Sequence, residues 1–344
     1  MSSKDSIGEG MKTTIVLDAM GSDQRPLPEL EGAVLASNKF DVQLILVGDE
    51  KTLTEGLAKV SGDKSRITIS HAPDALDMED HIREARAKKE NSMAVGMNLV
   101  KDGKAHAFVT AGNTGMAMYF GIKTFGMIQG VDRPCLVAVF PVEGGKCVIA
   151  DIGANAEVRP EFLVQFGQMA SVYSHLMLGV AEPKVGLIAN GEEEGKGNEL
   201  VKTAGPLMRT SVPNFVGNIE GKELFGGKVD VAITDGFTGN VLLKSVEAVA
   251  KLLLSTLKVE LMSNNQTKLG ALLAKPAFNK VRKMLDPNET GSAPLLGLDG
   301  LVFIGHGRSD AKAIVSAIEQ AVNAVESNLL EKLKNSIIPL ENQS

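Results

Sequence analysis

The chain has 344 residues, of which 44% are hydrophobic and 23% charged, a balance typical of a globular protein with a substantial core. A formal net charge of −6, with no cluster of Arg and Lys, argues against nucleic acid as a partner. The sequence contains no run of about 18 apolar residues and no apolar leader segment, so we expect a cytoplasmic protein. Its two cysteines, Cys135 and Cys147, lie in apolar stretches and are predicted to be buried thiols.

The first two-thirds of the chain alternate short β-branched runs with helical stretches. Strands are predicted at residues 14–17, 42–47, 107–110, 136–140, 147–150, 185–189 and 229–234. Helices are predicted at residues 81–101, 116–127 and 161–178. Because the strand candidates are near-continuously apolar, they are typical of parallel strands covered on both faces. This rhythm predicts a doubly wound α/β sandwich.

Glycine follows nearly every predicted strand, next to Asp, Asn or Thr. Six strands, ending near residues 17, 47, 110, 150, 189 and 234, have such loops. In an open α/β sheet, ligands bind beyond the carboxyl ends of the strands. Turn and helix-cap preferences would explain one such loop. Six of them favour a binding cleft at one edge of the sheet.

After residue 240 the pattern changes to long helices without an intervening strand. Apolar residues recur every three or four positions from 246 to 257 and form one stripe. A break at residues 264–265 precedes a second helical stretch at 268–284, which Pro276 is expected to kink or restart. We therefore predict a helical hairpin at 245–285. Its apolar turn region favours dimer or core packing, with lipid contact as a compatible alternative.

Two loops are candidate anion sites, at residues 112–115 and 237–240. Each leaves a buried strand and opens a helix, where glycine allows close approach and free N–H groups favour negative charge. Neither loop has the spacing of a Walker motif or of the GxGxxG dinucleotide motif. Each loop taken alone is a weak signal for phosphate.

Two side chains in glycine-rich segments are candidates for the chemistry. Lys196 lies between two glycines in a charged loop and would bind a phosphate or oxyanion, with a solvated loop as the alternative. His306 also lies between two glycines, before a closing helix at 311–333, and is a candidate for proton transfer. No nucleophile elbow or reactive-cysteine setting indicates covalent catalysis.

Four aspartates surround the predicted anion site: Asp18, Asp23, Asp151 and Asp235. They would repel phosphate unless offset. Orienting donors, capping helices and holding a divalent ion are all compatible with their positions, and the sequence does not choose among them.

In chain order, these motifs resemble one family, the bacterial phosphate acyltransferases of phospholipid synthesis, which use acyl carrier protein thioesters. The resemblance extends from about residue 13 to residue 331. It rests on DAMG at 18–21, AGNTG at 111–115, DIGAN at 151–155, GEEEGKG at 191–197, DGFTGN at 235–240, LLG at 295–297 and GHG at 305–307. The chain departs from the family where Ser22 replaces a usual glycine and where Arg308 replaces a usual small residue.

The resemblance implies a three-layer α/β/α sandwich similar to phosphate acetyltransferases and to the isopropylmalate dehydrogenase class, with a projecting helical hairpin. It implies a single catalytic domain at 12–335, between a disordered segment at 1–11 and a tail at 336–344. It also implies a homodimer that works at the cytoplasmic face of the membrane. No cofactor is expected, and no residue is assigned as a metal ligand.

The activity implied by the resemblance is reversible formation of acyl-phosphate from long-chain acyl carrier protein and inorganic phosphate. The product would pass to a membrane glycerol-3-phosphate acyltransferase that makes lysophosphatidate. Three alternatives are a short-chain phosphate acetyltransferase using coenzyme A, a nicotinamide-dependent dehydrogenase of the isopropylmalate class, and a non-catalytic scaffold binding the carrier protein or a membrane.

The candidate site residues come from the loops and from the resemblance together. The catalytic candidates are Lys196, Asn240 and His306. The candidates for substrate and phosphate binding are Asp18, Gly21, Asp23, Gly112, Asn113, Thr114, Gly115, Asp151, Asn155, Glu193, Asp235, Thr238, Gly239 and Lys244.

Overall fold

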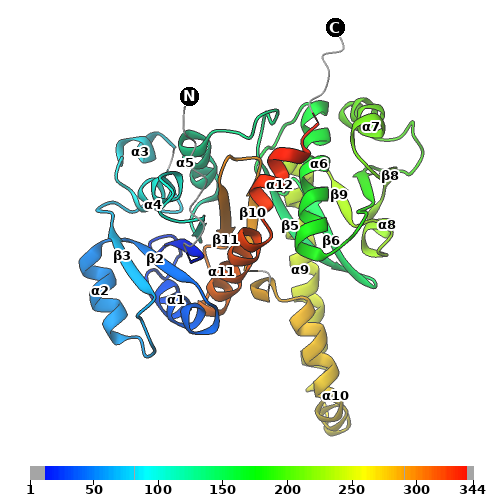
Figure 1. The fold of residues 1–344 in the computed structure, drawn as a ribbon. Helices are drawn as coiled ribbons and strands as arrows, with labels where there is room; N and C mark the ends of the chain where they lie inside the picture. The colour runs from blue at the N-terminus through cyan, green and yellow to red at the C-terminus, as the bar shows by residue number, and fades with distance from the viewer. Residues whose placement is uncertain (1–11, 81, 290, 339–344) are drawn as a thin grey trace, which may run out of the picture.

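The computed structural model describes residues 12–80, 82–289 and 291–338 (Figure 1). The segment predicted at 1–11 and the last six residues of the tail lie outside this part of the chain. The strands are β1 (Thr14–Asp18), β2 (Gln43–Gly48), β3 (Ile67–His71), β4 (Ala107–Thr110), β5 (Cys135–Val142), β6 (Gly145–Ala150), β7 (Val185–Ile188), β8 (Phe215–Ile219), β9 (Val231–Ile233), β10 (Ser292–Leu296) and β11 (Leu301–Gly305).

Helices alternate with these strands along the chain, as predicted. They are α1 (Leu27–Lys39), α2 (Glu50–Lys59), α3 (Ile82–Ala87), α4 (Ser92–Lys101), α5 (Thr114–Phe125), α6 (Pro160–Leu178), α7 (Glu199–Ser211), α8 (Gly221–Phe225), α9 (Gly236–Leu261), α10 (Asn265–Met284), α11 (Ala311–Glu326) and α12 (Leu329–Ser336). The helix predicted at 81–101 is two helices, because the Asn91 side chain caps α4 by accepting a hydrogen bond from Ala94 N.

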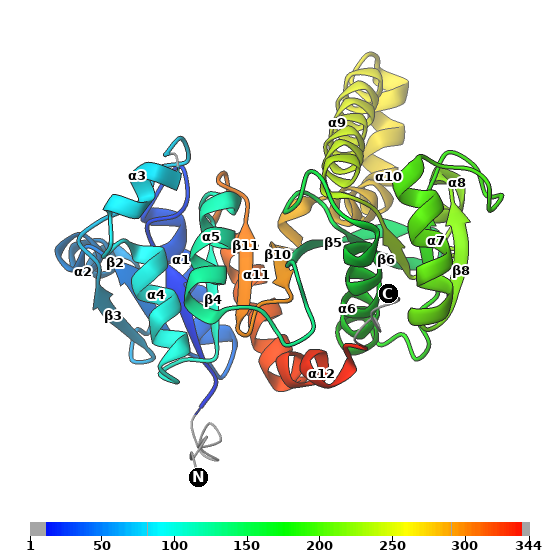
Figure 2. The same cartoon turned by 90° about the horizontal axis from the view of Figure 1, so that it is seen from above.

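The strands form one eleven-stranded sheet in the order β3-β2-β1-β4-β11-β10-β5-β6-β9-β7-β8. Figure 2 shows two lobes, one built around β2 and β4 and the other around β6 and β8, with β10 and β11 between them. Side chains of β1 alternate between two cores: Ile15 and Leu17 face one, and Val16 faces the other. Helices α1, α2, α6, α7, α11 and α12 contribute to the first core, and α3, α4, α5 and α8 to the second. The three-layer α/β/α sandwich is thus confirmed.

The sheet is mixed, which corrects the prediction of uniformly parallel strands. Strand β10 is antiparallel to both β11 and β5, and β5 is antiparallel to β6. A two-residue turn, with Gly144 at φ 77°, joins β5 to β6, and so short a connection forces antiparallel pairing. The carboxyl ends of β1, β4 and β11 therefore lie at one edge of the sheet, and those of β6, β9 and β7 at the opposite edge.

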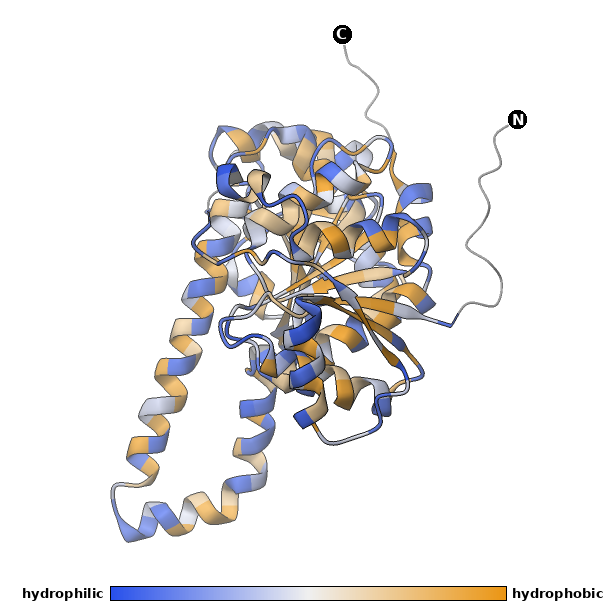
Figure 3. Ribbon diagram, turned by 90° about the vertical axis from the view of Figure 1, so that its left-hand side faces the viewer, coloured by the Kyte–Doolittle hydropathy of each residue, from blue (hydrophilic) through white to orange (hydrophobic). Residues whose placement is uncertain are grey.

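Helices α9 and α10 form the projecting hairpin, seen from the side in Figure 3. Asn264 caps α10 by accepting a hydrogen bond from Thr267 N, which explains the break between the helices. Helix α10 continues through Pro276 and bends along its length (Figure 3), so the expected kink is present without a restart. Large apolar side chains on the hairpin are exposed, Leu273 by 76%. None of the helices in the described part of the chain has the length and apolarity that a membrane crossing requires.

The structure tests the prediction about the two cysteines, and it contains strands that the sequence did not predict. Cys135 and Cys147 are buried free thiols, as predicted, and burial raises the pKa of Cys147 to about 12. Strands β3, β8, β10 and β11 were not predicted. In β10 and just after it, Pro294 and Gly297 interrupt the apolar pattern, although β10 joins the two halves of the sheet.

Candidate active site

One group of loops, which we call the first loop group, contains residues 18–23, 111–115 and 305–309 at the ends of β1, β4 and β11. The buried Asp18 accepts a hydrogen bond from Thr110 Oγ1 over 2.8 Å, and Thr110 Oγ1 in turn accepts one from Gly112 N over 3.0 Å. Asp23 N donates to Gly307 O over 2.7 Å. These bonds connect all three loops, so the sequence candidates at 18–23, 112–115 and 306 lie together.

Glycine is required where these loops touch. A Cβ at Gly21 would lie 2.8 Å from Gly112 N, and one at Gly307 would overlap with the side chain of Met78. The backbone contact at Gly21 leaves room only for hydrogen, whereas at Gly307 the flexible end of the Met78 side chain would have to move. The glycines of this group thus serve loop packing first.

The N-terminus of α5 opens from the same group. Asn113 caps it by accepting a hydrogen bond from Met116 N over 3.1 Å, and its amide donates to Met78 O over 2.8 Å. Thr114 is partly exposed and Gly115 is exposed in the first turn. A helix N-terminus that reaches solvent in this way favours a bound anion.

A second loop group contains residues 151–155 after β6 and 235–240 after β9. Asp151 is fully buried, and its Oδ1 accepts hydrogen bonds from the backbone N of Leu136, Gly153 and Ala154. Its Oδ2 accepts two more, from Asn155 N over 2.7 Å and Asn155 Nδ2 over 2.9 Å. Five donors around two oxygens match the acceptor-only inventory of a carboxylate. Asp151 and Asn155 therefore order this loop from within.

The start of α9 packs directly on that loop. Asp235 caps the helix through Thr238, whose N and Oγ1 each donate to its carboxylate over 2.8 Å. Gly236 N donates to Asn155 O over 2.8 Å. A Cβ at Gly239 would overlap with Asp151 O, so only glycine allows the helix to begin here. Three of the four aspartates therefore have one of the roles that the sequence left open. Asp235 caps a helix, and Asp151 and Asp18 order loops.

Helix α9 joins the two loop groups. Asn240 and Lys244 are one turn apart on one face of the helix, with Glu247 three residues further. Asn240 lies near Gly153, at the second loop group. At the first, Glu247 Oε2 lies 3.4 Å from Lys244 Nζ and 3.9 Å from Arg308 Nη2. Asn240, Lys244 and Glu247 thus follow one another along α9, from the second loop group to the 305–309 loop of the first.

His306 is exposed at this junction. Partial burial lowers its pKa below the usual value, and the charges of Arg308 and Lys244 act in the same direction. A neutral imidazole can accept a proton, whereas an imidazolium cannot. Two cations beside a histidine that is held neutral form a site suited to an anionic substrate.

Lys196 and Glu193 lie elsewhere. Both are exposed in the loop after β7, where Lys196 N donates to Glu193 O over 2.9 Å. Asn218 Nδ2, on β8, donates to Glu193 O over 3.1 Å. Strand β7 is six positions from β4 in the sheet order, or roughly 29 Å at the usual strand spacing. Strand β7 also ends at the opposite edge, so Lys196 and the 112–115 loop belong to different loop groups. Their joint binding of one phosphate stays a prediction.

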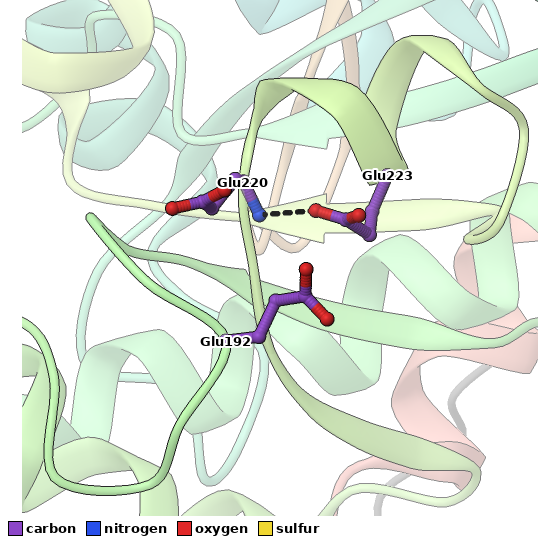
Figure 4. Close-up of side chains that lie close together, drawn as sticks. All are labelled: Glu192, Glu220 and Glu223. Atoms are coloured by element: carbon purple, nitrogen blue, oxygen red, sulfur yellow. Dashed lines mark hydrogen bonds between the residues drawn. The ribbon is translucent and has the colours of Figure 1, made fainter.

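Three carboxylates gather beside the Lys196 loop (Figure 4): Glu192, Glu220 and Glu223. Lys222 Nζ lies 2.6 Å from Glu192 Oε1 and within 3.7 Å of the other two carboxylates. The Lys222 ammonium lowers the pKa of Glu192 and offsets part of the negative charge of the three carboxylates. The cluster therefore fastens the loop to α8.

A groove of about 610 Å³ lies between α6, α10, α11 and the β5–β6 turn. Met177, Leu178 and Met284 give it an apolar floor, and Lys146 and Lys280 lie at its rim. None of its lining residues belongs to either loop group, so the groove is separate from the candidate site.

Sequence reasoning missed four residues of the site: Glu29, Thr110, Glu247 and Arg308. In the sequence, Thr110 is the last residue of a predicted strand, and Arg308 is a departure from the family pattern. Glu247 had a signal, since it follows Lys244 at helical spacing. Glu29 had none, because only the fold shows that the first turn of α1 is buried.

Comparison with known proteins identifies relatives over nearly the full chain. Residues 13–332 match the model of a family described as "Fatty acid synthesis protein". The chain is 45% identical to the phosphate acyltransferase of Elusimicrobium minutum (strain Pei191), over 94% of this chain and 95% of that protein. It is 43% identical to the phosphate acyltransferase of Clostridioides difficile (strain 630), over 94% of this chain and 96% of that protein.

Solved structures with a similar fold include a phosphotransacetylase from Streptococcus pyogenes, with a TM-score of 0.61 and 15% identity over 92% of this chain and 95% of that one. A branched-chain phosphotransacylase from Enterococcus faecalis V583 has a TM-score of 0.54 and 13% identity over 91% of this chain and 99% of that one. At such identities the likeness concerns the fold alone. The sequence matches carry the assignment, and by them the chain belongs to the phosphate acyltransferase family of fatty acid and phospholipid synthesis.

Proposed function

We propose that this phosphate acyltransferase transfers a long-chain acyl group from an acyl carrier protein thioester to inorganic phosphate, reversibly. The observation that carries the proposal is the grouping of Lys244, Arg308 and His306 around Glu247 at the 305–309 loop. The N-terminus of α5, a helix end that favours anions, begins in the same loop group. Thioester and acyl-phosphate are both activated, so no nucleotide is needed.

The cationic junction would hold the phosphate. Lys244 and Arg308 neutralise its charge, and the first turn of α5 at Thr114 and Gly115 supplies backbone N–H groups. Glu247 neutralises part of the charge of both cations and orients them. Fixing phosphate beside the bound thioester raises the rate through proximity and orientation.

Proton transfer is assigned to His306. An oxygen of HPO₄²⁻ attacks the thioester carbonyl carbon, and the neutral imidazole accepts the phosphate proton as the C–O bond forms. The C–S bond then breaks, and the imidazolium returns that proton to the departing thiolate. Asn240, one helical turn before Lys244, is placed to donate to the tetrahedral oxyanion.

Membership in an acyltransferase family argues against two of the alternative functions, the dehydrogenase and the non-catalytic scaffold. Family membership does not separate the proposed enzyme from a short-chain phosphate acetyltransferase, because the two differ in the acyl donor. Phe237 and Val241, near the start of the projecting hairpin, are exposed apolar residues. They favour a long acyl chain, which supports the carrier-protein donor.

The hairpin supports the proposed partners. Helices α9 and α10 carry eight Lys or Arg residues and two Glu, in a chain whose net charge is −6. Cationic helices with exposed apolar side chains suit a second subunit or anionic lipid. We propose a homodimer in transient contact with the membrane surface, where a glycerol-3-phosphate acyltransferase takes the product. Light scattering and vesicle sedimentation test these two associations separately.

The reaction is tested by phosphate-dependent release of free thiol from long-chain acyl carrier protein, with acyl coenzyme A as the control donor. Release that needs both phosphate and the carrier-bound donor is the expected result. Release from short-chain acyl coenzyme A alone would favour the acetyltransferase. No release from either donor would refute the proposal.

The site is tested by Lys244→Gln, with Lys251→Gln as the matched control two turns along α9. Loss of one charge-assisted contact of about 1.5–3 kcal/mol raises the KM for phosphate roughly 10- to 100-fold. The control variant keeps the wild-type KM. An unchanged KM in folded Lys244→Gln would remove this residue from the phosphate site.

A further inference from the structure

A buried carboxyl group lies beneath the first loop group and has no part in the chemistry proposed above. Glu29 is in the first turn of α1, and none of its surface is exposed. Its Oε1 accepts a hydrogen bond from Ser22 N over 3.0 Å. Its Oε2 and Ser22 Oγ are both buried without a hydrogen-bond partner among the described residues. Such a buried acid is rare and calls for an explanation.

Hydrogen bonds connect Glu29 to the candidate active site. Ser22 is followed by Asp23, whose N donates to Gly307 O over 2.7 Å. Gly307 is the neighbour of His306. Glu29 on α1 thus binds the 18–23 loop, and that loop binds the backbone of Gly307, next to His306.

The anchor uses the backbone of residue 22. Glu29 accepts from Ser22 N, a donor that the glycine usual in the family would also supply. The loop cannot shift without separating the buried groups from each other. A rigid backbone beneath a reactive side chain is what fixes its direction.

We propose that Glu29 is a positioning residue for the transfer reaction. It fixes the 18–23 loop through Ser22 N and, through Asp23 and Gly307, the direction of His306 toward Lys244 and Arg308. It does not touch the substrate. This inference rests on the proposed role of His306.

The environment of Glu29 gives the proposal a second readout. Burial raises the pKa of Glu29 to about 7, and the nearby charge of Asp18 at the end of β1 adds to this effect. Because burial disfavours the charged form, the buried arrangement holds the proton of Glu29 more tightly than a solvent-exposed one would. The loop is therefore held more firmly below pH 7, where Glu29 keeps its proton, than above it.

The test compares Glu29→Leu, which has no acceptor, with Glu29→Gln, which keeps one and cannot titrate. Glu31→Gln is the matched control, since Glu31 is exposed on the same helix. The measurements are kcat and KM for phosphate in thiol release, the pH profile of kcat, and amide hydrogen exchange in peptides covering 19–24 and 304–309.

We expect Glu29→Leu to lower kcat by about tenfold or more, with a smaller change in KM, because misplacing a catalytic group slows the chemical step. Exchange should rise in both peptides. Glu29→Gln should restore kcat to within about threefold of wild type and lose the component of the pH profile near 7. The control should match wild type throughout.

Wild-type kcat and exchange in folded Glu29→Leu would overturn the proposal, as would faster exchange confined to 19–24. If the leucine variant does not fold, Glu29→Gln decides: loss of the component near pH 7 supports the proposal, and an unchanged profile overturns it. Faster exchange in both peptides, with no thiol release even from wild type, would support the positioning and refute the proposed function instead.

Discussion

Replacing Asp151 with asparagine tests whether the second loop group depends on one buried carboxylate. The substitution keeps the shape of the side chain but turns one oxygen into an NH₂ group. If the remaining oxygen faces the three backbone donors at Oδ1, the new amide faces Asn155 N and Asn155 Nδ2, which are both donors. The two hydrogen bonds from Asn155 are then lost. Both of its donors face the new NH₂ group, which is itself a donor.

The magnitude follows from the bonds lost. Hydrogen bonds to a charged group contribute about 1.5–3 kcal/mol each, so two of them amount to roughly 3–6 kcal/mol. An unfolding entropy of about 2.1 cal/mol/K per residue gives roughly 0.7 kcal/mol/K for this chain. The expected fall in Tm is therefore about 4–8 °C. Burying a neutral amide costs less than burying a charge, which favours the lower half of that range.

Scanning calorimetry of purified Asp151→Asn measures this fall directly. Asp235→Asn is the control, since asparagine also caps helices and should leave Tm within about 1 °C of wild type. The reasoning is wrong if Asp151→Asn melts within about 1 °C of wild type. Thiol release should fall as well, because the 151–155 loop supports the start of α9.

Other outcomes follow from three further positions. Gly239→Ala places a Cβ against Asp151 O and must displace the start of α9, so turnover should fall by about tenfold or more; Gly270→Ala, with open space around it, should keep wild-type turnover, and equal rates for both would contradict the packing argument. The lowered pKa of His306 predicts that kcat/KM falls as pH drops through a value below 6.5, and that His306→Asn lacks this acid limb in a pH–rate series. For Glu29, the folded-state pKa of about 7 exceeds the unfolded value of 4.5, so the folded protein holds the proton more tightly. The free energy of unfolding should therefore decrease by about 3 kcal/mol as pH rises from 4.5 to 7, and urea denaturation of Glu29→Gln should lack this decrease.

The layers of the fold and the positions of the loops could be predicted from the sequence, because both depend on local patterns. Asp18 and Asp151 each follow a buried apolar run, which places them at strand ends. Their partners could not be predicted. Asp18 accepts from Thr110, 92 residues away, and only the completed sheet brings the two together.

The polarity of the sheet was beyond local patterns as well. Apolar strands look alike whether they pair in parallel or antiparallel, and Pro294 and Gly297 interrupt the pattern of β10. The β5–β6 hairpin makes β6, β9 and β7 run opposite to β1, β4 and β11. It therefore places the end of β7, before the Lys196 loop, at the other edge from the end of β4. It leaves Asn240, Lys244 and His306 together only because α9 crosses between the two edges.

Helix α9 also acts as a lever. Its 26 residues span about 39 Å, with Lys244 at the ninth residue, roughly 12 Å from the fixed end. A tilt of about 10° around the glycines that anchor that end would move Lys244 by about 2 Å and the far end by about 7 Å. A displacement of the far end of α9 thus moves Lys244 by about a third as much. Contacts that fix the hairpin in place therefore also fix the position of Lys244.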